Sequence, residues 1–539
     1  MLQNIIEYAY IEKHNLIDEN IPVYNSEPNS HFAVLKMKTK PKENPESEPI
    51  DPVYIHFTID YSGSMCEYSK NRNTKLDIVL HTVKSIVQFL SEKCWGKTER
   101  TISFGIDSFN HQYNELFPKM SIPKDDEELG DFEKMLSKKD RAVGNTNIEL
   151  ALKESSKKLN EYRAENPTHK LLHFFLTDGE PTSGETSAIL LSKLTNPHVP
   201  TVYMGYGSEH NSKLLKCLSN HSALGSCYEY IHDFEKVIDV CGEVLHKYLY
   251  SALNAFSMIC HGCRIYDSET HQWVTELKHG IVSSDQELIY SVIFDTEDID
   301  SDTLIHIDLL EHDMKIEVAQ LLYSFIDLSS NIVLYNDLSV YIFRQQVIEL
   351  LEKIGDIDDI YFSEIEKFRL SMNALFRNIR NYIKTNRCNE SNKKLLNVLC
   401  DDLYISYMTL GTDLGQTYSI SRQSTHTRQT SYRIHLDLDE VTQNYNYDLK
   451  PISAIRRSVT QSYSQIPDSE IPDSDLDLDS QIPNLDLDLI SSVGLERNAY
   501  TLPIRYDENN IENYNYEATQ DVLYSPNVQR TIRDLKRER

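Results

Sequence analysis

The chain has 539 residues and a formal net charge of −29, because 83 residues are Asp or Glu and only 54 are Lys or Arg. This length exceeds a single domain, and an apolar fraction of 40% is enough for sizeable cores. The acidic balance argues against binding to nucleic acid or to anionic membrane surfaces, since both depend on basic patches.

The same composition indicates where the protein resides. No apolar run approaches the ~20 residues of a membrane span, and the N-terminus lacks the pattern of a secretory signal. Nine cysteines at scattered positions are typical of reduced thiols. We therefore expect a cytoplasmic protein with no membrane span, or a component of a particle assembled in the cytoplasm.

Residues 1–50 form an N-terminal segment with one expected strand. The sequence HFAVLKMKT at His31–Thr39 alternates apolar and polar residues, as half-buried strands do. The Pro- and Glu-rich PKENPESEPIDP that follows is typical of a linker.

Strands and helices alternate over residues 51–250, which predicts a doubly wound, Rossmann-like α/β domain with a mainly parallel sheet. The run YIHFTI at Tyr54–Ile59 is apolar, β-branched and aromatic, as buried parallel strands are. Leu171–Thr177 is a second strand of this kind, and an amphipathic helix at Ile148–Leu159 lies between the two. Helices are expected on both faces of the sheet.

Oxygen-bearing side chains gather in three turns of this domain. They are Asp60, Ser62, Ser64, Thr146 and Asp178. The first and last turns follow strands, so their side chains should meet at the carboxyl edge of the sheet, where such folds bind ligands. Hard oxygen donors suit Mg²⁺ or Mn²⁺ better than Zn²⁺, and no single turn supplies enough of them. The alternative is three ordinary turns rich in Ser, Thr and Asp.

The three turns resemble a known motif. Asp60-x-Ser62-x-Ser64, Gly-x-Thr146 and Thr-Asp178-Gly, in this order, resemble the metal-ion-dependent adhesion site (MIDAS) of von Willebrand factor type A (vWA) domains. The resemblance implies that Ser62, Ser64 and Thr146 hold Mg²⁺ or Mn²⁺ directly, and that Asp60 and Asp178 hold it directly or through water. It further implies a protein partner whose Asp or Glu side chain completes the coordination. No catalytic motif is present, so we expect no enzyme activity.

The chain changes character after the α/β domain. Residues 251–335 alternate or run apolar between turns, which predicts an antiparallel β domain, completed by the strand at His31–Thr39. Residues 336–411 have the 3.6-residue period of helices. Residues 412–539 include the repeat IPDSEIPDSDLDLDSQIPNLDLDL and predict a low-complexity, mostly disordered acidic tail.

A wider resemblance covers about residues 50–430. The run from Pro200 to Ile259 and the stretch LGQTYSISRQSTHTRQT at Leu414–Thr430 resemble plant vWA ubiquitin ligases of the RING type. This chain has no paired CxxC clusters with intervening Cys or His, so it lacks the RING and its ligase activity is not implied. A large DNA virus or a protist is a fitting source for such a core without a RING. Two further functions therefore stay open: an adaptor linked to ubiquitin ligation, and a structural or virion-associated component.

Overall fold

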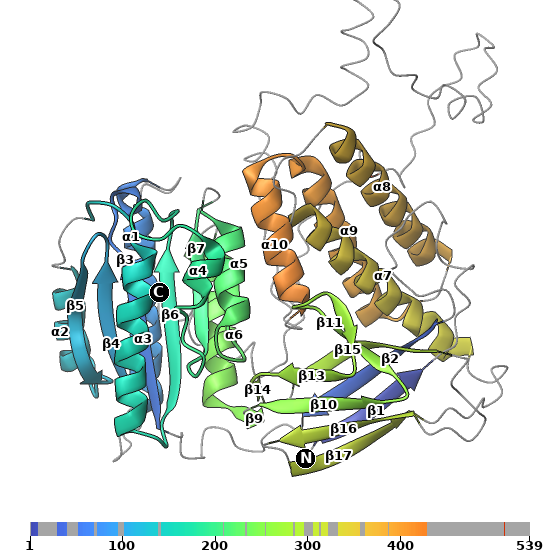
Figure 1. Ribbon diagram of the computed structural model, residues 1–539, viewed down its shortest axis with the longest axis horizontal. Coiled ribbons are helices and arrows are strands. Elements are labelled where there is room, and N and C mark those ends of the chain that lie inside the picture. The colour runs from blue at the N-terminus through green and yellow to red at the C-terminus, as the bar shows by residue number, and fades with distance from the viewer. Residues whose placement is uncertain are drawn as a thin grey trace, which may run out of the picture.

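The computed structural model contains three parts: an α/β domain, an antiparallel β domain and a bundle of helices (Figure 1). It describes residues 2–8, 30–39, 52–68, 73–94, 102–137, 142–207, 210–231, 234–253, 255–283, 286–295, 305–311, 314–321, 332–355, 362–385, 388–427 and 511. None of the helices within these ranges is long and apolar enough to cross a membrane.

The α/β domain is built on one six-stranded sheet. Its strands are β3 (Val53–Asp60), β4 (Ile102–Phe109), β5 (Tyr113–Ser121), β6 (Lys170–Thr177), β7 (Thr201–Tyr206) and β8 (Cys227–Ile231). They lie in the order β5-β4-β3-β6-β7-β8, and only the edge strand β5 is antiparallel to its neighbour. All eight residues of β3 are buried, as expected of a central strand covered on both faces. This is the doubly wound, Rossmann-like architecture expected from the sequence.

Two groups of helices cover this sheet. They are α1 (Lys75–Cys94), α2 (Asp126–Ser137) and α6 (Phe234–Leu249) in one group, and α3 (Ile148–Glu165), α4 (Ala188–Ser192) and α5 (Ser212–His221) in the other. The helix after β3 therefore belongs to one group, and the helix after β6 to the other. These two strands are neighbours, so the sheet has its switch point between them, and the crevice for a ligand opens there.

The antiparallel domain is a sandwich of two sheets. One contains β1 (Leu2–Tyr8), β2 (Ser30–Thr39), β15 (Glu287–Asp295), β11 (Arg264–Asp267) and β12 (Gln272–Val274), and the other contains β13 (Glu276–His279), β10 (Phe256–His261), β16 (Ile305–Glu311) and β17 (Met314–Leu321). Short strands β9 (Ser251–Leu253) and β14 (Val282–Ser283) pair beside them. Leu35 and Met37 of β2 pack in one core with Met258, Ile265 and Val292.

The position of β2 confirms that this strand completes the antiparallel domain. This strand pairs with β15 along its whole length, from Ser30 opposite Asp295 to Lys38 opposite Glu287. It has no partner in the six-stranded sheet. Segments before and after the α/β domain thus form a single sandwich, and the α/β domain is inserted between them.

Four helices form the third part. They are α7 (Ile332–Gly355), α8 (Phe362–Thr385), α9 (Glu390–Thr409) and α10 (Asp413–Thr427). Helix α10 lies beside α5 of the α/β domain, and Leu414, Tyr418 and Ile420 join the core of that domain (Figure 1). A hydrogen bond of 3.4 Å from Thr417 to Ser212 spans the two parts.

Helix α10 corrects one expectation. The tail was expected to begin at residue 412, yet residues 413–427 are a buried helix. The reason is that polar side chains, including Arg422, fill its buried face, so no apolar period marks it in the sequence. The expected disorder beyond Thr427 falls outside the described residues, except for Ile511, which packs against the helices.

Candidate metal site

The turn after β3 is fixed by backbone hydrogen bonds to neighbouring loops. The N–H of Tyr61 donates to the carbonyl of Phe109 (2.7 Å), and the N–H of Gly63 donates to the carbonyl of Gly144 (3.0 Å). The N–H of Val143 donates back to the carbonyl of Tyr61 (2.9 Å). The loop that carries Thr146 is therefore held against the loop that carries Ser62, although more than 80 residues separate them in the chain.

Asp60 lies at the buried end of β3 with no solvent exposure. Its Oδ1 accepts from the N–H of Ser62 (2.8 Å), and its Oδ2 accepts from the hydroxyl of Thr177 (2.6 Å). Burial raises the pKa of Asp60 to about 7, and the nearby charge of Asp178 adds to this effect despite the hydrogen bonds from Thr177 and Ser62. The ionised carboxylate is thus held at a free-energy cost that a bound cation would relieve.

A chain of short contacts joins the other predicted residues. The hydroxyl oxygens of Ser62 and Ser64 are 3.0 Å apart, and Ser64 donates to Oδ1 of Asp178 (2.8 Å). A Cβ placed on Gly179 would lie 3.5 Å from Oγ1 of Thr146 and 3.6 Å from Oγ of Ser64. The hydroxyls of Thr146 and Ser64 therefore both lie close to Gly179.

Thr146 is oriented through its backbone. Its N–H donates to the hydroxyl of Thr182 (2.8 Å), and its carbonyl accepts from the N–H groups of Thr182 (3.0 Å) and Ser183 (3.2 Å). These bonds leave the Thr146 hydroxyl for the site. The structure therefore brings together all five residues selected from the sequence, from three loops, at the carboxyl edge of β3 and β6.

The donor set fits a hard divalent cation. It offers two carboxylates and three hydroxyls, without a His or Cys, which matches Mg²⁺ or Mn²⁺ rather than Zn²⁺. Among the described residues, no three His, Cys, Asp or Glu side chains gather as a metal cluster. Any ion in this site would consequently depend on the hydroxyl oxygens as much as on the two carboxylates.

Lys75 is a member of this site that sequence reasoning missed. Its ammonium group donates to Oδ2 of Asp178 and to Oε2 of Glu67, at 2.7 Å each. Burial lowers the pKa of Lys75, but the two carboxylates outweigh it and raise the pKa above its usual value. One feature of the sequence points to Lys75. It is the first residue of α1, where the helix dipole disfavours a cation unless an anion compensates.

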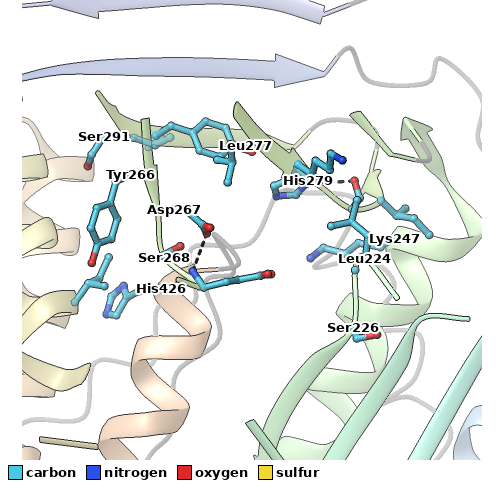
Figure 2. Close-up of a pocket in the computed structure, with 18 of the residues that line it drawn as sticks. Leu224, Ser226, Lys247, Tyr266, Asp267, Ser268, Leu277, His279, Ser291 and His426 are labelled. Atoms are coloured by element: carbon cyan, nitrogen blue, oxygen red, sulfur yellow. Dashed lines mark hydrogen bonds between the residues drawn. The ribbon is translucent and has the colours of Figure 1, made fainter. Parts of the chain in front are cut away.

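A cavity of about 100 Å³ lies apart from this site, at the junction of the three parts. Figure 2 shows Tyr266 and His426 on one side of it and Lys247 and His279 on the other, with the turn at Asp267 between them. None of its lining residues belongs to the candidate metal site. It marks where the α/β domain, the sandwich and the bundle meet.

No protein-family model matches the chain, and no curated protein matches it by sequence. Solved structures resemble it in fold. The ArnB paralog VWA2 of Sulfolobus acidocaldarius is 14% identical with a TM-score of 0.45, and the match covers 79% of this chain and 98% of that chain. A von Willebrand factor type A protein of Catenulispora acidiphila is 10% identical with a TM-score of 0.49, covering 81% of this chain and 97% of that chain.

A third similar structure was solved with metal. Proximal thread matrix protein 1 of the mussel byssus, with a zinc-occupied MIDAS motif, is 18% identical with a TM-score of 0.29, covering 40% of this chain and 50% of that chain. These likenesses are too distant to assign a metal or a partner to this chain.

Proposed function

We propose that this protein binds an acidic side chain of a protein partner through a divalent cation, Mg²⁺ or Mn²⁺, held by the vWA-type domain. The observation that carries the proposal is the continuous contact from Ser62 through Ser64 to Asp178, with Asp60 and Thr146 beside it. The bond from Ser64 to Asp178 joins two loops that are 114 positions apart in the chain.

Charge balance supports a binding role. Asp60 and Asp178 together match the charge of one divalent ion, while Ser62, Ser64 and Thr146 add neutral oxygens. These five side chains supply fewer than the roughly six ligands that Mg²⁺ takes, so a bound ion would keep a coordination position open for a further carboxylate. This matters in a chain with a net charge of −29, because an acidic partner would otherwise be repelled at short range.

We propose binding rather than catalysis. The sequence carries no recognised catalytic motif around these five residues, and their oxygens are of the kind that holds a hard cation. The expected setting is the cytoplasm or a particle assembled there.

Calorimetric titration of Mg²⁺ into the full chain tests the metal site. Wild type should bind one equivalent, Asp60→Ala should bind none, and Asp77→Ala should bind as wild type does. Asp77 is a suitable control because it is an exposed carboxylate in the first turn of α1 that accepts hydrogen bonds from the N–H and the hydroxyl of Thr74. Equal affinity in wild type and Asp60→Ala would overturn the proposal.

Partner capture tests the second half of the proposal. A protein captured by wild type in Mg²⁺ should be lost in EDTA and should not be captured by Asp60→Ala. Capture that is insensitive to EDTA would mean that the interaction does not use the metal.

A second candidate is an adaptor linked to ubiquitin ligation. The stretch that resembles the RING-type ligases, from Leu414 onward, coincides with α10, which packs against α5 of the vWA-type domain. Binding of ubiquitin or of a conjugating enzyme to the full chain would favour this function, and a high copy number in purified particles would favour a structural one.

A further inference from the structure

We propose that Lys75 is a tethered cation that competes with the divalent ion for Asp178 and so sets the affinity of the site for metal. This inference rests on the proposed function, because it concerns the same site. It assigns a role to a residue outside the five predicted ligands.

The contact geometry places Lys75 where a metal would act. Its Nζ lies 2.7 Å from Oδ2 of Asp178, whose side chain is fully buried, while Ser64 occupies the other carboxylate oxygen. The lysine side chain is itself only 16% exposed. A divalent ion that uses Asp178 must displace this ammonium group or bind close to its positive charge, and either event costs binding free energy.

Lys75 lies at a helix position that is unfavourable for a cation, and its ion pair with Asp178 compensates for this. Residue 75 begins the helix, where the positive end of the helix dipole disfavours a lysine. The side-chain stem lies beside Gly207, since a Cβ on that glycine would be 3.4 Å from Cε of Lys75. Gly207 has a φ of +83°, a backbone conformation that favours glycine. The residue beside the Lys75 side chain therefore has no side chain of its own.

Glu67 provides a second anchor for the ammonium group. Its Oε2 is 2.7 Å from Nζ of Lys75, and its side chain is 61% exposed, in contrast to Asp178. When a divalent ion takes Asp178, Lys75 can keep its bond to Glu67 at the surface. The exchange therefore breaks the bond of Lys75 to the buried carboxylate and leaves its bond to the exposed one.

The test compares Mg²⁺ affinity in Lys75→Gln and wild type by calorimetry. Removing the competing charge should raise the affinity by about tenfold or more. Lys84→Gln is the matched control, since Lys84 is on the same helix and pairs with Glu133 at the surface. It should bind Mg²⁺ as wild type does. Unchanged or weaker affinity in Lys75→Gln would overturn the inference.

Thermal unfolding gives a readout that does not depend on a partner. In EDTA, Lys75→Gln should melt below wild type, because Asp178 then lacks a counter-charge beside Asp60. In saturating Mg²⁺ this difference should disappear or reverse. A melting difference that is the same in EDTA and in Mg²⁺ would assign Lys75 a purely structural role.

A second variant covers the case in which Lys75→Gln fails to fold. Glu67→Gln changes only an exposed side chain and removes the second anchor, so it should weaken Mg²⁺ binding, the opposite of Lys75→Gln. The results separate the two proposals. Loss of binding in Asp60→Ala with no effect of Lys75→Gln or Glu67→Gln contradicts this inference alone. Absence of Mg²⁺ binding in wild type, Lys75→Gln and Glu67→Gln contradicts the proposed function.

Discussion

Asp402 of α9 and Arg422 of α10 form a bidentate ion pair that is almost completely buried, with contacts of 2.8 and 3.0 Å. Tyr418 and His426 bond to the same carboxylate at 2.9 and 2.8 Å. One acidic side chain of α9 thus fixes three residues on the buried face of α10. This arrangement explains why a polar segment forms a packed helix between the bundle and the α/β domain.

Asp402→Asn should destabilise the protein strongly. The substitution removes the charge of the carboxylate that binds the buried guanidinium of Arg422 in two places, and breaking a buried ion pair typically costs about 3 kcal/mol or more. Denaturant unfolding would measure the loss, with the exposed Lys393→Gln on the same helix as the control. Limited proteolysis should also cut within 413–427 in the variant. A loss below about 1 kcal/mol would show that the buried pair contributes little.

The same carboxylate predicts a dependence of stability on acid. Burial alone would raise the pKa of Asp402, but the charge of Arg422 and the hydrogen bond from His426 outweigh it and hold the pKa at about 2. Because the folded-state pKa is depressed, the ionised carboxylate stabilises the fold above about pH 4, and this contribution of about 2 kcal/mol is lost as the pH falls from about 4 to about 2. Cys400 stays neutral throughout, since burial raises its thiol pKa to about 12.

Unfolding measurements at a series of pH values test this prediction. The difference in unfolding free energy between wild type and Asp402→Asn should narrow as the pH falls through this window. Burial also lowers the pKa of His426, so protonation of this ring opposes folding at mildly acidic pH and adds a separate decline above the window. A difference that stays constant down to about pH 2 would mean that Asp402 is not the titrating group.

The local parts of the candidate site could be predicted from the sequence. A buried strand that ends in Asp60 and Ser62 is visible as an apolar run followed by an oxygen-rich turn, and strand order brings Asp178 to the same edge. The pairing of β2 with β15 was also predictable, because alternation of apolar and polar residues excludes a strand from a sheet that is buried on both faces.

The ion pairs could not be predicted in the same way. Lys75 contacts a carboxylate 103 positions along the chain, and Arg422 contacts one 20 positions away. Such contacts leave no periodic signal, because each depends on a single pair of residues that the fold brings together. Helix α10 was missed for this reason, since hydrophobic periodicity detects only helices whose buried face is apolar.

Two glycines lie in close contact where the α/β domain meets the sandwich. A Cβ on Gly280, which precedes β14, would lie 2.6 Å from Cα and 2.7 Å from N of Gly225. Backbone atoms cannot move aside as a flexible side chain can, so Gly280→Ala should cost about 1–3 kcal/mol. Gly130→Ala on α2 is the control, because nothing lies within 4 Å of its Cβ, and it should be neutral or stabilising.

Thermal unfolding and Mg²⁺ titration of these two variants distinguish a local effect from a general one. Gly280→Ala should melt below wild type yet bind Mg²⁺ with the same affinity, since neither glycine contacts the residues of the candidate metal site. A melting point equal to that of Gly130→Ala would show that the two backbones can separate without loss of stability.

Variants of Thr146 test whether its uncharged hydroxyl contributes more to metal binding or to partner binding. Thr146→Ala removes one uncharged ligand of the roughly six that Mg²⁺ requires, so the affinity for the ion should fall only a few-fold. Partner binding should fall further, because water that replaces the hydroxyl alters the geometry of the position that an incoming carboxylate must reach.

Thr146→Ser keeps the hydroxyl, and its backbone bonds to Thr182 and Ser183 do not involve the side chain, so it should behave nearly as wild type does. Calorimetry for Mg²⁺ and partner capture in saturating Mg²⁺ separate the two effects. Equal behaviour of the Ala and Ser variants in both measurements would exclude the Thr146 hydroxyl from the site.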